Sequence, residues 1–191
     1  MDIAVSPTAV WQTNAQSNYV WRIALSNHAT TATQIGGSIG DVAIDHGNNA
    51  WLAVTGNGSI FEISDSGGYD NTPYGGYQVA GTTPQNIAVD GLGNVFAGAV
   101  TDAASPGTLL EYSNSANLIS PGLGYTGSNI IPVVPAVPGG IAIDGSGNIW
   151  ITGGPFGTSN PIYVSEIIGL AAPVVTPRAT ATTNNTLGTR P

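Results

Sequence analysis

Three aspartates recur at matched places along the chain and are the first candidates for chemistry. Asp45, Asp90 and Asp144 each end a short apolar segment, and each runs into a turn of glycine and asparagine. A ring of carboxylates could bind a cation, whereas an Asp at such a place also accepts backbone N–H groups in its own turn. Repetition in every strong copy favours the structural turn. The matching turn residues are Asn49, Asn94 and Asn148.

Residues that would support catalysis or metal binding are scarce. Cysteine is absent, and His28 and His46 are the only histidines. A metal site usually needs several His, Cys or carboxylate ligands held in one geometry, and no nucleophile-elbow motif is present. The sequence therefore predicts no catalytic residues, no metal and no cofactor, and it predicts that the chain is not an enzyme.

A second matched series carries glutamates, at Glu62, Glu111 and Glu166, with Arg22 at the corresponding place in the first copy. Two carboxylates facing each other could act as an acid–base pair. A solvent-facing position or an ion pair between repeats is the simpler interpretation, with Arg22 contacting a neighbouring Glu.

Aromatic residues form a third matched series. Trp11, Trp51, Phe96 and Trp150 lie at corresponding positions, where large side chains fill the core between repeats or, alternatively, stack on sugars. Packing between the repeats is the favoured role. The candidates for an interface are Trp21, Arg22, Tyr69, Tyr74 and Tyr125.

These side chains are positioned by a repeated strand–turn–strand unit. Its phrase is Val42–Asp45, Ile87–Asp90 and Ile141–Asp144, with a fainter copy at Ile3–Ser6. Four short strands per unit of about 40–50 residues match one blade of a β-propeller. We predict an all-β, propeller-type array of four antiparallel sheets over residues 1–177. The expected units are 1–35, 36–81, 82–135 and 136–177, followed by a polar tail at 178–191.

The segment 141–152, echoed at 42–53 and 87–98, resembles the NHL-repeat propellers, and within them proteins similar to virginiamycin B lyase. The resemblance implies a propeller of about six blades, and in the lyases a metal held by His and Glu. Because no such His/Glu cluster is evident here, the lyase activity is not carried over. Four units leave three possibilities: a closed four-blade ring, a part of a longer protein, or ends completed by other copies.

The composition limits the kinds of partner that the chain is expected to bind. Only 7% of residues are charged, lysine is absent and the formal net charge is −8, which argues against nucleic acid and anionic membranes. The Thr-, Asn- and Gly-rich composition favours an extracellular or cell-surface location. The sequence predicts a self-assembling, structural or protein-binding module that associates with itself through blade ends, edge strands and the C-terminal tail. The alternatives are a lyase-like enzyme and a glycan-binding propeller.

Overall fold

The computed structural model describes residues 1–69, 76–101, 107–126, 134–155 and 163–174. In these segments the chain forms fourteen β-strands and no helix. Blade 1 contains β1 (Asp2–Val5), β2 (Ala9–Thr13), β3 (Tyr19–Ala24) and β4 (Thr30–Gln34). Blade 2 contains β5 (Ile39–Ile44), β6 (Ala50–Val54), β7 (Ser59–Ile63) and β8 (Tyr77–Gln78). Blade 3 contains β9 (Thr82–Val89), β10 (Val95–Thr101) and β11 (Thr108–Tyr112). Blade 4 contains β12 (Val137–Ile143), β13 (Ile149–Gly154) and β14 (Tyr163–Ile167).

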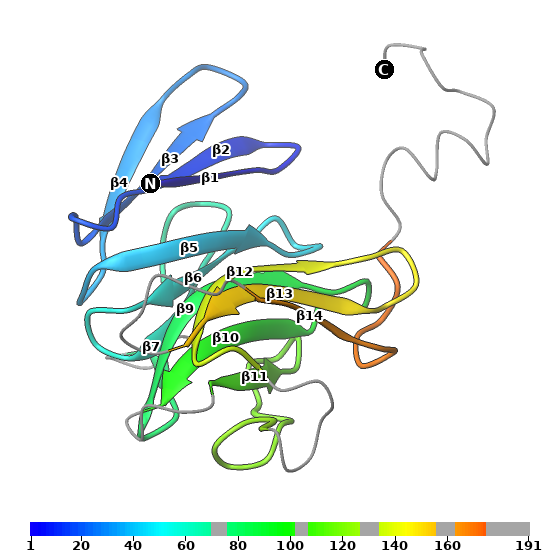
Figure 1. Ribbon diagram of the computed structural model, residues 1–191. Helices are drawn as coiled ribbons and strands as arrows, with labels where there is room; N and C mark the ends of the chain where they lie inside the picture. The colour runs from blue at the N-terminus through cyan, green and yellow to red at the C-terminus, as the bar shows by residue number, and fades with distance from the viewer. Residues whose placement is uncertain (70–75, 102–106, 127–133, 156–162, 175–191) are drawn as a thin grey trace, which may run out of the picture.

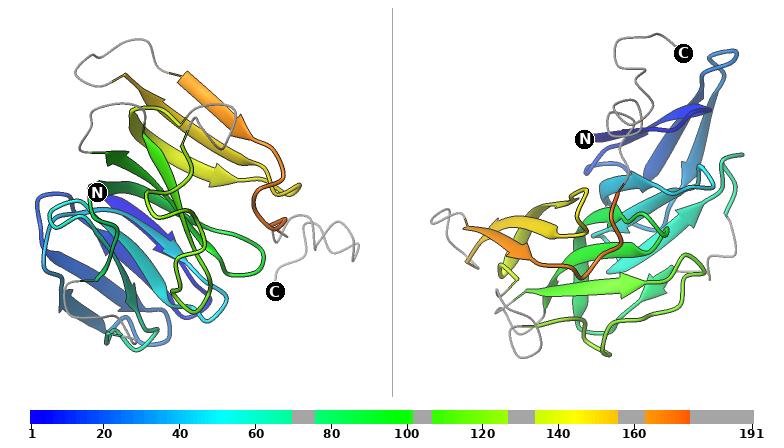
Figure 2. Two further views of the ribbon diagram at one scale, coloured as in Figure 1. Left: turned by 90° about the horizontal axis from the view of Figure 1, so that it is seen from below. Right: turned by 90° about the vertical axis from the view of Figure 1, so that its right-hand side faces the viewer.

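The four sheets follow one another in chain order, with blades 1 and 4 at the two ends (Figures 1 and 2). Within each sheet consecutive strands pair antiparallel, as expected for strands joined by short turns. The prediction of an all-β array of four antiparallel sheets is confirmed. The unit boundaries stay a prediction, and the proposed tail at 178–191 lies outside the described residues.

The strand registers make the blades directly comparable. An alanine of the first strand lies opposite the aromatic residue of the second in every blade. These pairs are Ala4–Trp11, Ala43–Trp51, Ala88–Phe96 and Ala142–Trp150. The turn between these two strands also repeats, because Asn48, Gly93 and Gly147 share a positive φ of 66°, 85° and 82°. Glycine and asparagine tolerate that conformation better than other residues.

The hydrophobic core lies between the blades. Trp11 packs between blades 1 and 2 with Val42, Leu52 and Phe61. Trp51 packs between blades 2 and 3, and Phe96 between blades 3 and 4. All three aromatic side chains are completely buried. Alternation along each strand sends one set of side chains to the preceding blade and the other set to the following blade.

The prediction of four strands per unit is not met in blade 4, where the described residues form three. Residues 172–174 form no strand, and the carbonyl of Ala172 accepts the N–H of Gly91, in the turn of blade 3, at 3.2 Å. Residues 127–133, between β11 and β12, lie outside the described residues. Pro138 lies in β12 at a register shift. The first strand of a blade is also an edge, so a proline there breaks no ladder.

No helix of the described segments has the length and apolarity needed to cross a membrane.

Candidate functional site

The aspartate turns of blades 2 and 4 are built alike. Asp45 Oδ1 accepts the backbone N–H groups of Gly47 (2.8 Å) and Asn49 (2.9 Å). Its other oxygen accepts the indole N–H of Trp51 at 3.0 Å. Asp144 repeats the arrangement, with Trp150 Nε1 at 3.1 Å from Oδ2. These carboxylates are held in place by N–H donors of their own turn and blade.

The hydrogen bonds of Asp144 have an electrostatic consequence. The backbone N–H of Asn148, followed by the indole of Trp150, lowers the pKa of the Asp144 carboxyl to about 2. Hydrogen bonds to the charged form always act in this direction. Asp144 is therefore ionised throughout the neutral range and is unsuited to donate a proton there.

Asp90 of blade 3 departs from this pattern because its aromatic partner, Phe96, has no N–H group. Asp90 Oδ1 still accepts the backbone N–H groups of Leu92 (2.9 Å) and Asn94 (2.8 Å). Its second oxygen accepts the backbone N–H of Ala172 at 2.9 Å instead. The chain after blade 4 is thus attached to the turn of blade 3.

The glutamate series joins this turn network. Asn49 Nδ2 donates to Glu62 at 3.1 Å, and Asn148 Nδ2 donates to Glu166 at 3.2 Å. In blade 3, Tyr125 donates its hydroxyl to Glu111 at 2.7 Å. Burial raises the pKa of Glu111, although the bond from Tyr125 opposes that rise. Burial and the Glu111 contact raise the pKa of Tyr125 to about 12.

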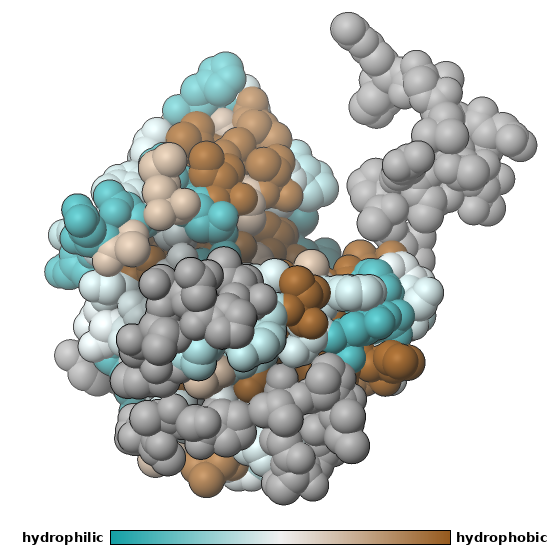
Figure 3. Space-filling model, in the orientation of Figure 1, coloured by the Kyte–Doolittle hydropathy of each residue, from teal (hydrophilic) through white to brown (hydrophobic). Residues whose placement is uncertain are grey.

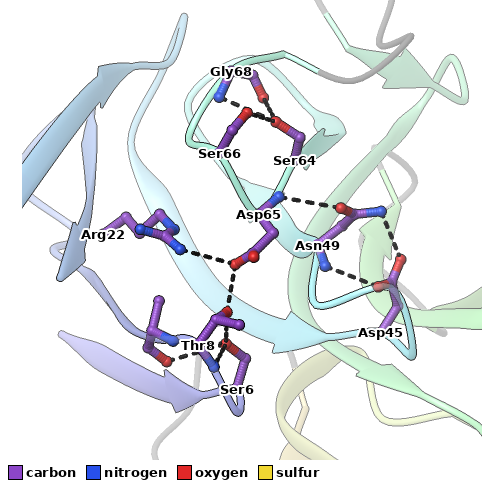
Figure 4. A network of polar contacts seen from close by, with 10 residues as sticks. Ser6, Thr8, Arg22, Asp45, Asn49, Ser64, Asp65, Ser66 and Gly68 are labelled. Atoms are coloured by element: carbon purple, nitrogen blue, oxygen red, sulfur yellow. Dashed lines mark hydrogen bonds and ion pairs between the residues drawn. The ribbon is translucent and has the colours of Figure 1, made fainter. Parts of the chain in front are cut away.

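Arg22 links blade 1 to blade 2. Its guanidinium lies 3.1 Å from Asp65 Oδ1, and Thr8 donates its hydroxyl to the same oxygen at 2.6 Å (Figure 4). The neighbour is therefore an aspartate of blade 2 and not the expected glutamate. Burial raises the pKa of Asp65, but the bonds from Thr8 and Arg22 outweigh it and lower the pKa overall. Arg22 is only 14% exposed, and its ion pair joins two blades of its own chain; a place for it at an outer interface stays a prediction.

The other interface candidates have mixed environments. Tyr69 is exposed, and its hydroxyl donates to the carbonyl of Gln34. Tyr125 is engaged with Glu111 as described, and Tyr74 lies outside the described residues. Trp21 lies on the side of blade 1 that faces away from blade 2, within 6.1 Å of the Tyr19 ring. Among the described interface candidates, Trp21 alone belongs to a larger uncovered surface.

The two histidines do not form a metal centre. His46 lines a cavity of about 240 Å³ with Asp45 and Asp90, at the turn ends of blades 2 and 3. Within the described segments, however, no three His, Cys, Asp or Glu side chains come together as metal ligands.

Blade 4 has an uncovered face, called face 4, which consists of Ala142, Trp150, Thr152, Val164 and Glu166. Trp150 is 39% exposed and Val164 is 64% exposed. The predicted packing of Trp150 between blades is therefore not found. The sequence cannot show this, because Trp150 has the same register as the buried Trp51, and the difference is that no blade follows it within the described residues.

Blade 1 has the opposite uncovered face, called face 1, which consists of Ile3, Val5, Val10, Gln12, Trp21 and Ile23. Ile3 and Val5 are both more than half exposed. Figure 3 shows hydrophobic residues gathered over this blade. An apolar patch of this kind commonly marks an interaction site on a soluble protein.

A carboxyl pair on the first strands of blades 1 and 2 was missed from the sequence. Asp2 Oδ2 accepts the N–H of Val42 at 3.2 Å, and Asp41 Oδ2 accepts the N–H of Ile87 at 2.9 Å. Each carboxylate thus reaches the first strand of the next blade. Burial, followed by the hydrogen bond and the charge of Asp2, raises the pKa of Asp41 to about 7. This is the described carboxyl group best suited to exchange a proton near neutral pH.

Asn86 continues the series in blade 3. The positions in register are Asp2, Asp41, Asn86 and Gly140. Asn86 is 3% exposed, and neither polar atom of its side chain has a hydrogen-bond partner among the described residues. A sequence signal existed, because each of the four residues stands directly before the repeated aliphatic–Ala–aliphatic phrase.

Comparison with known proteins defines the class of fold. No protein-family model matches the chain, and no curated protein matches it. A gluconolactonase from Xanthomonas campestris is similar in structure, with a TM-score of 0.59, 14% identity and coverage of 87% of this chain and 56% of that one. Virginiamycin B lyase from Staphylococcus aureus gives a TM-score of 0.53 and 16% identity, over 85% of this chain and 54% of that one. A protein of unknown function from Bacteroides caccae gives a TM-score of 0.55 and 17% identity, over 88% of this chain and 57% of that one.

These similarities support a β-propeller fold, and this chain spans a little more than half the length of the proteins it resembles. Membership of the NHL-repeat group specifically stays a prediction. The expectation that the chain is not an enzyme is corrected, because proteins with this fold include a gluconolactonase and a lyase. Scarcity of histidine and cysteine was too narrow a criterion, since acid–base chemistry can also use carboxyl groups.

Proposed function

We propose that this chain is a propeller module that binds protein, taking up further β-sheet on face 1 and face 4. One observation carries the proposal: Trp150 is 39% exposed, whereas Trp51 at the same register position is completely buried by the following blade. A tryptophan in that position stabilises an interface between blades when a partner covers it. The composition supports an extracellular or cell-surface setting, with 7% charged residues and no lysine.

A photocrosslinking experiment tests whether face 4 is covered by protein. Benzoylphenylalanine replaces Val164 of face 4 in one chain and Leu92 in a control chain, since both residues are more than 60% exposed and Leu92 lies on a turn of blade 3. We expect Val164, but not Leu92, to crosslink to a polypeptide in the cells that naturally produce the chain. Equal crosslinking at the two positions would contradict the proposal.

An acid–base enzyme is the second candidate, favoured by the Asp2–Asp41 pair. A carboxyl group with a pKa of about 7 can serve as general acid or base at neutral pH, and lactonases and lyases occur among the similar propellers. Gluconolactone hydrolysis, measured from about pH 5 to about pH 9, should inflect near pH 7 in the unmodified chain and not in Asp41→Asn. Absence of turnover at every pH would remove gluconolactone from consideration.

A further inference from the structure

We propose that the partner of both uncovered faces is a second copy of this chain. Face 4 of each copy packs on face 1 of the other, so that two copies close one ring of eight blades. The inference rests on the proposed function, because it names the protein that the two faces bind.

Face 4 has the residues that form one side of the interfaces inside the chain. Trp150 corresponds to Trp51, and Val164 corresponds to Ile60. Trp51 and Ile60 are both completely buried against blade 3. Face 4 therefore repeats a surface that, one interface earlier, is covered by the next blade.

Face 1 has the residues that form the other side of those interfaces. Ile3 corresponds to Val42, and Trp21 corresponds to Phe61. Val42 and Phe61 are 6% and 3% exposed, because they receive Trp11 from blade 1. Face 1 thus corresponds to a surface that receives a tryptophan from the preceding blade, and within the described residues no preceding blade covers it.

The two faces differ in kind, which decides how two copies meet. A contact of face 4 with face 4 would oppose two projecting tryptophans and match no interface in the chain. A head-to-tail contact of face 4 with face 1 reproduces the interfaces already present three times. Head-to-tail contacts close into rings when the rotation between copies permits, and otherwise extend as filaments.

The size of the chain favours closure with two copies. Each copy has four blades and spans about 54–57% of the length of the propellers it resembles, so one copy fills only part of such a ring. Eight sheets fall within the range of about four to eight blades found in propellers. Face 1 has no charged side chain, and on face 4 only Glu166 carries a charge, so burial of the two faces removes little charge from water.

Complementation between two variants tests the arrangement. Ile3→Lys disables face 1, and Val164→Lys disables face 4; both residues are more than half exposed, so each variant should fold. The unmodified chain, of 19.2 kDa, should have twice that mass by light scattering at ~200 μM, and each variant alone should be a monomer. An equimolar mixture should regain a dimer through its one intact contact, and Leu92→Lys should dimerise like the unmodified chain.

Each other result overturns the inference. A monomeric unmodified chain excludes the second copy as partner, and dimerisation of either variant alone excludes the head-to-tail contact. Assemblies larger than a dimer exclude the two-chain ring. The broader proposal is tested separately, because a crosslink from Val164 to a different protein would retain protein binding while excluding self-association. We expect each lysine to raise the dissociation constant by at least about 100-fold, as for loss of an interface hot spot.

Discussion

Replacement of Trp51 by alanine should lower the free energy of unfolding by about 3–5 kcal/mol, whereas the same change at Trp150 should cost a monomer much less. Trp51 is completely buried, and Trp150 is 39% exposed. Each indole donates one hydrogen bond to an aspartate of its own blade, at 3.0 Å and 3.1 Å. Both variants lose that hydrogen bond. The difference between their free energies of unfolding therefore measures the packing between blades.

Urea unfolding of the two variants provides the measurement, at a protein concentration low enough to keep the chain monomeric. Trp11→Ala is a useful third variant, because Trp11 is buried between blades but its indole N–H has no partner among the described residues. The free energy of unfolding that Trp11→Ala loses should therefore approach the loss in Trp51→Ala, although no indole hydrogen bond contributes to it. Equal losses for Trp51→Ala and Trp150→Ala would contradict an uncovered face 4.

The second large effect is expected at Asp41, where Asn should stabilise the protein at pH 8. Asp41 has a pKa of about 7 in the folded chain and 3.8 as its ordinary value. From about pH 4 to about pH 7 the folded chain keeps a proton that the unfolded chain has released. The free energy of unfolding therefore falls by up to about 4 kcal/mol as pH rises through this window, at 1.36 kcal/mol per pKa unit. Above about pH 7 it stays level.

Asn at position 41 stays neutral and can still accept the N–H of Ile87, as Asp41 does at 2.9 Å. Blade 3 already has an amide, Asn86, at the corresponding place. The midpoint of urea unfolding, followed from about pH 4 to about pH 8, should fall for the unmodified chain and change less for Asp41→Asn. Asp2→Asn is the control, because removing the Asp2 charge should lower the pKa of Asp41 and weaken the same dependence. Parallel pH profiles for all three proteins would contradict the raised pKa.

The fold was largely predictable because its information is local. The Asp turn, the glycine or asparagine with positive φ and the alternating strands each depend on neighbours within about five residues. The positions of Asp45, Asn49 and Trp51 in one blade therefore follow from the repeat. Repetition also indicated the array of sheets, since one blade alone cannot bury both of its apolar faces.

Contacts between blades could not be predicted in the same way. The pairing of Asp2 with Asp41, and of Arg22 with Asp65, joins side chains about forty residues apart in the chain. The residues of one repeat do not by themselves show which atoms of the next sheet they meet.

The sequence by itself determined four strand–turn repeats, their aspartate turns and the matched aromatic series. Only the tertiary structure decided which members of each series are covered. Trp51 and Trp150 lie at matching positions of the repeat and donate the corresponding indole hydrogen bond, yet one is buried and the other exposed. Burial depends on whether another blade follows in space, and no residue within a repeat encodes that.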